Sequence, residues 1–239
     1  MLTVAIVVAG GAGARMGAGM PKALVPLAGR PLVSWCLEAL ARSERVDATL
    51  VVAPRGHRSQ MQAALGRDPA LGALMDVVTG GSTRSRSVLA GLRALPSGVE
   101  RVLVHDAARP LLRPALADAV AEGVEGVEGA IAASPLTDTL KRAAPGDGGA
   151  DLLITRTLDR AGLWRAETPQ GFRLDALLAA FERAEPAEID GATDCASLVE
   201  AMGGRVRIVP STAPNLKVTT PADLELAELL LRAVGAAPA

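Results

Sequence analysis

The sequence predicts an α/β protein with a Rossmann-like, mostly parallel sheet flanked by helices, and with a protruding β-hairpin arm for dimerisation. Short β-branched apolar runs at residues 2–8 and 48–53 are typical of strands covered on both faces. Helical apolar patterns follow these runs, so right-handed crossovers should place helices on both faces of the sheet. A stretch near residues 136–166 instead alternates apolar and polar residues, which indicates the arm.

The composition is that of a globular chain without a strong overall charge. Its 239 residues are 49% hydrophobic, so we expect a single domain over residues 1–239 with the arm inserted at about 136–166. A net charge of −1 and 2% aromatic residues argue against binding to nucleic acid or to a membrane. Cys36 and Cys195 lie in apolar helical patterns and should be reduced, and the N-terminus lacks the basic region of a signal peptide. We therefore expect a cytoplasmic protein.

A glycine-rich loop follows the first strand. Five glycines occur within residues 10–20, and Arg15 and Lys22 add positive charge. Such a loop can turn several backbone N–H groups toward one anion. A surface turn with two solvated bases is the alternative, but open α/β sheets bind ligands at this place, which favours a phosphate site.

The loop does not match two common nucleotide-binding motifs. A G-x-G-x-x-G motif that starts at Gly11 would need glycine where the chain has Met16, and the second strand ends without a ribose-binding carboxylate. A P-loop needs Gly-Lys followed by Ser or Thr, whereas Lys22 stands between Pro21 and Ala23. The loop is therefore predicted to wrap a nucleoside triphosphate with two separate cations.

The later elements are predicted from apolar periodicity and capping residues. Helices should begin near Pro31, His57, Ser82, Leu174, Thr193 and Pro221, and strands should cover residues 75–81, 128–136 and 205–211, with a short strand around Lys217. Near residue 82, a glycine pair precedes hydroxyl residues in the first turn of a helix. This is either an ordinary N-cap by Ser82 or a second element that binds an anion or a base.

A strand that starts at residue 101 ends in His105 and Asp106. At the carboxyl end of a parallel strand, Asp106 would lie beside the glycine-rich loop and could hold Mg²⁺ through its oxygens. Its structural alternative is to cap the next helix. Arg109 precedes Pro110 and should therefore lie on an extended loop near the same edge.

The arm follows from the alternating pattern of residues 137–172, which contains a flexible turn at 145–149. A hairpin this long has little core of its own. Its apolar residues should therefore pack on another subunit of a homodimer; they are Leu140, Leu152, Leu153 and Ile154. Polar residues on the arm would then complete the neighbour's site; they are Thr139, Lys141, Arg156 and Arg160.

The chemistry suggested by these residues is transfer at phosphorus. Four basic residues lie in loops or at strand ends, namely Arg15, Lys22, Arg160 and Lys217, and a strand-end carboxylate accompanies them. No Ser–His or Cys–His nucleophile is apparent. Cations that spread transition-state charge and a carboxylate that places a metal suit a direct in-line phosphoryl or nucleotidyl transfer.

Several spaced motifs resemble those of the 2-C-methyl-D-erythritol 4-phosphate cytidylyltransferases of the non-mevalonate isoprenoid pathway. These are Gly-Gly-x-Gly-x-Arg-Met followed by Pro-Lys, then HDAARP, DTLK, TPQGF and NLKVTTPADL. The resemblance covers about residues 4–230. It implies a nucleotidyltransferase domain that moves CMP from CTP, with Mg²⁺, to methylerythritol phosphate and releases pyrophosphate.

The resemblance also implies a role for each matching residue. Arg15 and Lys22 would stabilise the pentacoordinate α-phosphorus, while Arg160 and Lys217 would position the acceptor phosphate. The CTP-binding set would be Ala9, Gly10, Gly11 and Gly13 together with the cytosine-reading residues Gly81, Ser82 and Ser87. The methylerythritol phosphate site would comprise Thr139, Thr168 and Thr193, with Asp106 and Arg109 nearby.

Two alternatives to this function come from the same residues. Ala9-Gly10-Gly11 replaces the more frequent Ala-Ala-Gly and resembles the sister ribitol-5-phosphate cytidylyltransferases, whereas HDAARP resembles the isoprenoid enzymes. A non-catalytic nucleotide-binding module could also use this fold, because fold does not fix function. Such a module would not need the second pair of cations for an acceptor phosphate.

Overall fold

The computed structural model describes residues 1–10, 20–66, 68–71, 73–146, 149 and 151–233. Within these residues the main sheet has seven strands: β1 (Leu2–Val8), β4 (Ala48–Ala53), β5 (Leu74–Thr79), β6 (Val99–Asp106), β7 (Gly129–Pro135), β10 (Trp164–Arg173) and β11 (Val206–Pro210). Their order across the sheet is β11-β7-β10-β6-β1-β4-β5. β10 runs antiparallel to both of its neighbours, and the other pairs are parallel. The predicted mostly parallel sheet is confirmed.

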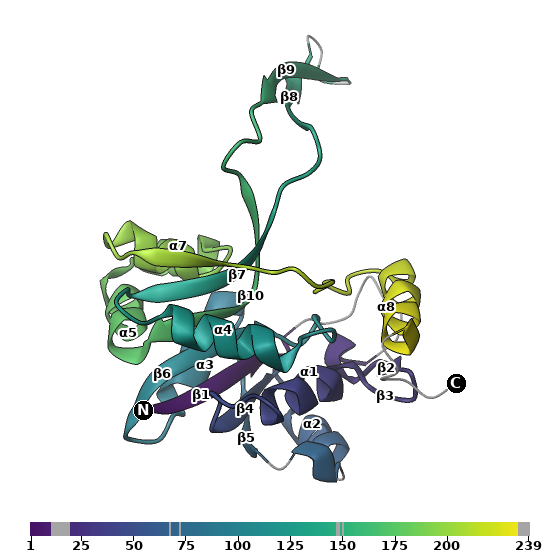
Figure 1. The fold of residues 1–239 in the computed structure, drawn as a ribbon, viewed down its shortest axis with the longest axis vertical. Coiled ribbons are helices and arrows are strands. Elements are labelled where there is room, and N and C mark those ends of the chain that lie inside the picture. The colour runs from purple at the N-terminus through teal and green to yellow at the C-terminus, as the bar shows by residue number, and fades with distance from the viewer. Residues whose placement is uncertain (11–19, 67, 72, 147–148, 150, 234–239) are drawn as a thin grey trace.

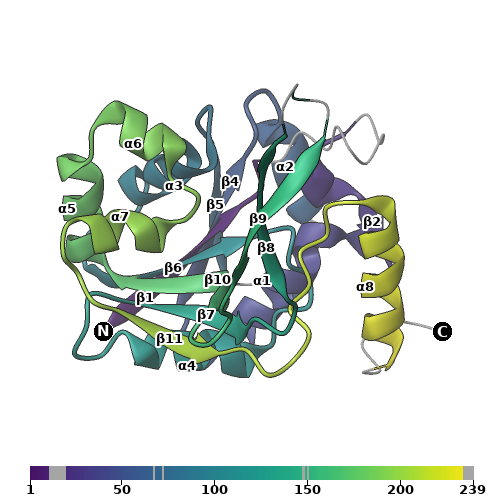
Figure 2. The same ribbon diagram turned by 90° about the horizontal axis from the view of Figure 1, so that it is seen from above.

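Helices cover both faces of this sheet (Figures 1 and 2). One face carries α1 (Leu32–Ala41), α2 (Arg58–Leu65) and α4 (Pro114–Gly123), and the other carries α3 (Arg84–Arg93), α5 (Leu174–Arg183), α6 (Pro186–Gly191) and α7 (Cys195–Ala201). Each layer buries an apolar stripe, such as Val33, Leu37 and Leu40 on the first face and Val88, Leu177 and Phe181 on the second. The sheet is thus buried on both sides, as its β-branched strands predict.

Smaller elements lie outside the main sheet. The helical turns η2 (Lys22–Leu24) and η3 (Pro69–Leu71) lie in connections, and β2 (Pro26–Leu27) pairs with β3 (Arg30–Pro31). The last helix, α8 (Pro221–Ala233), packs on that short pair through a separate apolar cluster that includes Leu27, Trp35 and Leu231. Figure 1 shows α8 beside β2 and β3, away from the helices that cover the sheet.

A two-stranded hairpin of β8 (Leu140–Pro145) and β9 (Leu152–Leu158) projects far from the main sheet (Figure 1). Leu152 is 76% exposed and Ile154 is 65% exposed, so this hairpin presents apolar side chains to solvent. It leaves the body between the end of β7 and the start of β10, which is the same edge where β6 ends.

Four sequence-based assignments require correction. Residues 164–172 were included in the alternating arm pattern, but they form most of β10 and lie between β6 and β7. The N-cap of α3 is Thr83, whose hydroxyl accepts from the Arg86 N–H, and not Ser82. Lys217 lies on an irregular segment and not on a short strand. α4 and α6 were not among the expected helices, although Pro114 and Pro186 at their starts are common helix openings.

Candidate active site

The candidate site is a cavity of about 240 Å³ at the carboxyl ends of β1 and β6. β1 pairs with β4 on one side and with β6 on the other, so this edge is the point where the order of the strands reverses. Open α/β sheets bind ligands at such a point. Many of the predicted site residues line the cavity, namely Ala9, Gly10, Lys22, Gly81, Ser82, Ser87, Asp106 and Lys217.

The turn between β5 and α3 closes one side of this cavity. A Cβ atom on Gly81 would lie 2.3 Å from the Cβ of Arg86, so the turn has no room for a side chain at this position. The buried Ser87 hydroxyl accepts from the Gly81 N–H at 3.1 Å and donates to the Thr83 carbonyl at 2.9 Å. Ser87 therefore shapes the turn and leaves backbone groups of the turn at the cavity wall.

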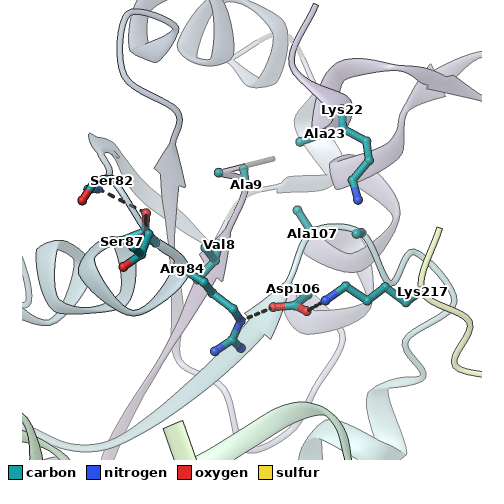
Figure 3. Close-up of a pocket in the computed structure, with 14 residues that line it drawn as sticks. Val8, Ala9, Lys22, Ala23, Ser82, Arg84, Ser87, Asp106, Ala107 and Lys217 are labelled. Atoms are coloured by element: carbon teal, nitrogen blue, oxygen red, sulfur yellow. Dashed lines mark hydrogen bonds and ion pairs between the residues drawn. The ribbon is translucent and has the colours of Figure 1, made fainter. Parts of the chain in front are cut away.

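Asp106 is held between two cations (Figure 3). Arg84 Nε donates to Asp106 Oδ1 at 2.9 Å, and Lys217 Nζ donates to Oδ2 at 2.7 Å. Burial favours the protonated acid, but the charges of Arg84 and Lys217 outweigh it and hold the pKa of Asp106 well below its usual range. Asp106 is therefore ionised, and it does not cap α4, which begins after Arg113.

A buried hydrogen-bond network lies behind Asp106. His105 Nε2 is 3.1 Å from the Arg109 carbonyl, which can only accept, so this nitrogen carries the proton. His105 Nδ1 then accepts from the Thr168 hydroxyl at 3.2 Å, and the Thr168 oxygen accepts from the Asp106 N–H at 3.1 Å. Burial lowers the pKa of His105 to about 4, so the ring is neutral and the network is complete near neutral pH.

An irregularity in β10 brings Thr168 to this position. Ala166 pairs with Ala133 and Gln170 pairs with Ile131, so three residues of β10 lie opposite Ala132. Pro169 is one of the three, and a proline inside a sheet requires such a bulge. The other two bulge residues are buried: the Thr168 hydroxyl accepts from the Asp106 N–H at the end of β6, and Glu167 accepts from Ser134 of β7 and from Asn215.

Lys22 and Lys217 both face the cavity, as Figure 3 shows. Lys22 lies at the start of η2, and its Nζ donates to the Val218 carbonyl at 2.9 Å. The two lysines lie about 200 residues apart in the chain. Lys22 contacts the carbonyl of Val218, and Lys217, the residue before Val218, contacts the carboxylate of Asp106. This arrangement puts two ammonium groups and one carboxylate around one space.

Other predicted site residues lie elsewhere. Thr139 and Thr193 are exposed and do not line this cavity, and Thr168 lies behind Asp106. Arg160 is exposed on the arm, where its Nη1 donates to the Thr137 carbonyl. Arg109 Nη1 donates to the Asn215 carbonyl at 2.6 Å. Gly11, Gly13 and Arg15 lie outside the described residues.

Sequence reasoning missed Arg84, which lines the cavity and holds Asp106. One signal could have identified it. Arg84 is the first residue of α3, and the partial positive charge of a helix N-terminus disfavours a cation there. An arginine at this position therefore suggests a carboxylate partner from a distant segment.

The carboxylates of the cavity bear on the predicted Mg²⁺. Among the described residues, no group of three or more His, Cys, Asp or Glu could hold a metal ion. Asp106 lines the cavity with both oxygens already accepting from cations, although each oxygen has a further lone pair. This donor set fits a Mg²⁺ ion that takes most of its ligands from substrate phosphates and water.

Comparison with known proteins identifies the family. The sequence profile described as IspD, 2-C-methyl-D-erythritol 4-phosphate cytidylyltransferase, matches residues 3–233. The chain belongs to this family. The IspD resemblance drawn from the sequence motifs is thereby confirmed over nearly the whole chain.

Individual IspD proteins agree in sequence and in fold. The 2-C-methyl-D-erythritol 4-phosphate cytidylyltransferase of Parasynechococcus marenigrum strain WH8102 is 42% identical over 232 residues, which are 95% of this chain and 96% of that protein. The crystal structure of the Thermus thermophilus cytidylyltransferase has a TM-score of 0.73 at 32% identity and covers 95% of this chain and 98% of its own. The 4-diphosphocytidyl-2C-methyl-D-erythritol synthase of Anaerococcus prevotii DSM 20548 has a TM-score of 0.80 at 25% identity, with coverage of 97% and 96%.

Over the described part of the chain, no helix is both long enough and apolar enough to cross a membrane.

Proposed function

We propose that this protein transfers CMP from CTP to 2-C-methyl-D-erythritol 4-phosphate and releases pyrophosphate, in the synthesis of isoprenoid precursors. Membership of the IspD family over residues 3–233 supports this activity. The structural observation that supports it best is the cavity lined by Lys22, Lys217 and Asp106, in which Lys217 Nζ donates to the Asp106 carboxylate. Two lysines in a cavity whose single carboxylate among the described residues is also paired with Arg84 leave a net positive charge, which suits a reaction between two phosphate-bearing substrates.

The reaction is a direct displacement at the α-phosphorus of CTP. A phosphate oxygen of the acceptor forms a bond to this phosphorus, while the bond from the phosphorus to the oxygen bridging to the β-phosphate breaks. Pyrophosphate leaves with that electron pair. Because the acceptor oxygen is already ionised, no general base is required.

The lysines stabilise the charge that develops during this displacement. Lys22, together with Arg15, would bind the α-phosphate and the leaving pyrophosphate, while Lys217, together with Arg160, would bind the acceptor phosphate. Preorganised donors of this kind typically contribute about 10²–10³ in kcat each. Both lysines line the cavity, so they would compensate the negative charge that develops on the phosphates, and the reaction would need no covalent intermediate on the protein.

The base and the metal complete the proposed CTP site. Gly10 and the turn of residues 81–83 line the cavity and would hold the nucleotide, with the cytosine edge against backbone groups of the turn. Asp106 would contribute a ligand to Mg²⁺ bound by the triphosphate, and this ion would supply further neutralisation of phosphate charge. Arg109, Thr139, Thr168 and Thr193 would contribute to the acceptor side from the segments described above.

We also propose that the arm, about residues 136–166 inserted in a single nucleotidyltransferase domain, forms a homodimer. The support is the exposure of Leu152, Leu153 and Ile154 on a two-stranded hairpin, because such a hairpin is marginally stable unless it packs on something.

Two buried, free thiols, Cys36 and Cys195, support a location in the reducing cytoplasm.

The function is tested by measuring pyrophosphate release from CTP and Mg²⁺ with each candidate acceptor. We expect release with methylerythritol phosphate and little with ribitol 5-phosphate, since family membership does not favour the ribitol reaction. Faster release with ribitol 5-phosphate would replace the proposed acceptor. Binding of CTP without release with either acceptor would favour a non-catalytic module.

A further inference from the structure

An irregular segment, residues 215–218, contacts both lysines of the cavity. Lys217 belongs to it and donates from Nζ to Asp106 Oδ2 at 2.7 Å, while the Val218 carbonyl accepts from Lys22 Nζ at 2.9 Å. The segment has neither helical nor strand structure. Its backbone groups therefore lack the regular partners of a ladder and must be fixed by other contacts.

Asn215 fixes one end of the segment. Its side chain is nearly buried, at 7% exposure, and Nδ2 donates to Glu167 Oε2 at 2.9 Å and to the Thr168 carbonyl at 2.8 Å. Its own carbonyl accepts from Arg109 Nη1 at 2.6 Å. One amide group thus joins the segment to the bulge in β10, directly behind Asp106.

The other end of the segment is fixed by Val218. Its side chain is fully buried, and its N–H donates to the Ala108 carbonyl at 2.7 Å. Between these two ends, Lys217 has a 44% exposed side chain, so packing contributes little to its placement. Its position depends on the backbone that Asn215 and Val218 hold.

We propose that Asn215 is a positioning residue that sets the places of both Lys217 and Lys22. The proposal rests on the proposed function, because it concerns how the two cations of that reaction are held. Without the amide, Glu167 and the Thr168 carbonyl lose a donor, and the segment can shift away from Asp106. A shift of about 1 Å in a reacting group can cost about 10²-fold in rate.

A double-mutant cycle separates positioning from general destabilisation. Asn215→Ala is expected to lower kcat by about 10–100-fold in the wild-type background, and by a smaller factor in Lys217→Met and in Lys22→Met chains, since part of what it positions is then missing. Equal factors in all three backgrounds would overturn the proposal. Ser134→Ala is the matched control, because it removes the hydrogen bond to the other oxygen of Glu167 and touches neither lysine nor the segment.

A second variant covers the case in which Asn215→Ala does not fold. Asn215→Asp places a second carboxylate beside that of Glu167. Adding Glu167→Gln puts the amide at position 167 and the carboxylate at position 215, which restores one hydrogen bond between the two side chains. The kcat of the double variant should be at least tenfold higher than that of Asn215→Asp alone. Recovery of the melting temperature without recovery of kcat would overturn the proposal.

A crystal structure of Asn215→Ala, or of Asn215→Asp if the alanine variant does not fold, tests positioning independently of activity. We expect the separation of Lys217 Nζ from Asp106 Oδ2, or of Lys22 Nζ from the Val218 carbonyl, to exceed 4 Å, against 2.7 and 2.9 Å here. Retention of both contacts would overturn the inference and leave the proposed function intact. Failure of the wild-type enzyme to release pyrophosphate would instead contradict only the function.

Discussion

The two ion pairs on Asp106 should contribute unequally to stability. The Arg84 side chain is 22% exposed and that of Asp106 is 10% exposed, so Arg84→Met would leave a largely buried carboxylate without its main partner. Removing one member of a buried pair typically costs 3–5 kcal/mol, and we expect about 3 kcal/mol here because some solvent reaches the pair. Lys217 is 44% exposed, so Lys217→Met should cost about 1 kcal/mol or less.

Urea unfolding followed by circular dichroism measures these costs. For 239 residues, about 3 kcal/mol corresponds to a fall of roughly 6–12 °C in melting temperature. Arg55→Met, at an exposed loop position, is the control for loss of an arginine and should change stability by less than about 0.5 kcal/mol. Lys217→Met should nevertheless lower kcat strongly, although its free energy of unfolding changes little. Equal costs for Arg84→Met and Lys217→Met would refute the assignment of Arg84 as the structural partner of Asp106.

Three further predictions concern acid, the α3 turn and the arm. Burial lowers the pKa of His105 to about 4, whereas the pKa in the unfolded chain is near 6.5, so the unfolded state binds the proton first as the pH falls. The free energy of unfolding should therefore fall by up to about 3 kcal/mol from pH 6.5 to 4. A His105→Gln chain titrated in parallel should show a flatter profile; an equal slope would contradict this cause. Gly81→Ala should weaken CTP binding at least tenfold in calorimetry, because its Cβ would clash with Arg86, and unchanged affinity would refute that geometry. Leu152→Lys with Ile154→Lys should convert a dimer to monomers in analytical ultracentrifugation, whereas an unchanged dimer would assign the interface to another surface.

The sheet and the position of the site could be predicted because their signals are local. β-branched runs and helical periodicity specify strands and helices from neighbouring residues, and the glycine-rich loop after β1 marks the edge where ligands bind. Asp106 was found in the same way, as a carboxylate at the end of a strand. In the structure Lys22, Asp106 and Lys217 line the same cavity.

The supporting contacts could not be predicted because they join distant segments. Arg84 and Asp106 are 22 residues apart, and Asn215 lies 48 residues from Glu167. The insertion of β10 between β6 and β7 was missed because its sequence continues the alternating pattern of the arm. Its bulge then moves Thr168 behind Asp106, a position that only the tertiary pairing of β10 determines.

An assay of Lys22→Ala with saturating CTP and methylerythritol phosphate measures whether a cation held at the carboxyl end of β1 stabilises the transfer of CMP. We predict that kcat for pyrophosphate release falls by about 10²–10³ while circular dichroism and melting temperature stay near those of the wild type. An unchanged kcat in a folded Lys22→Ala chain would contradict the account.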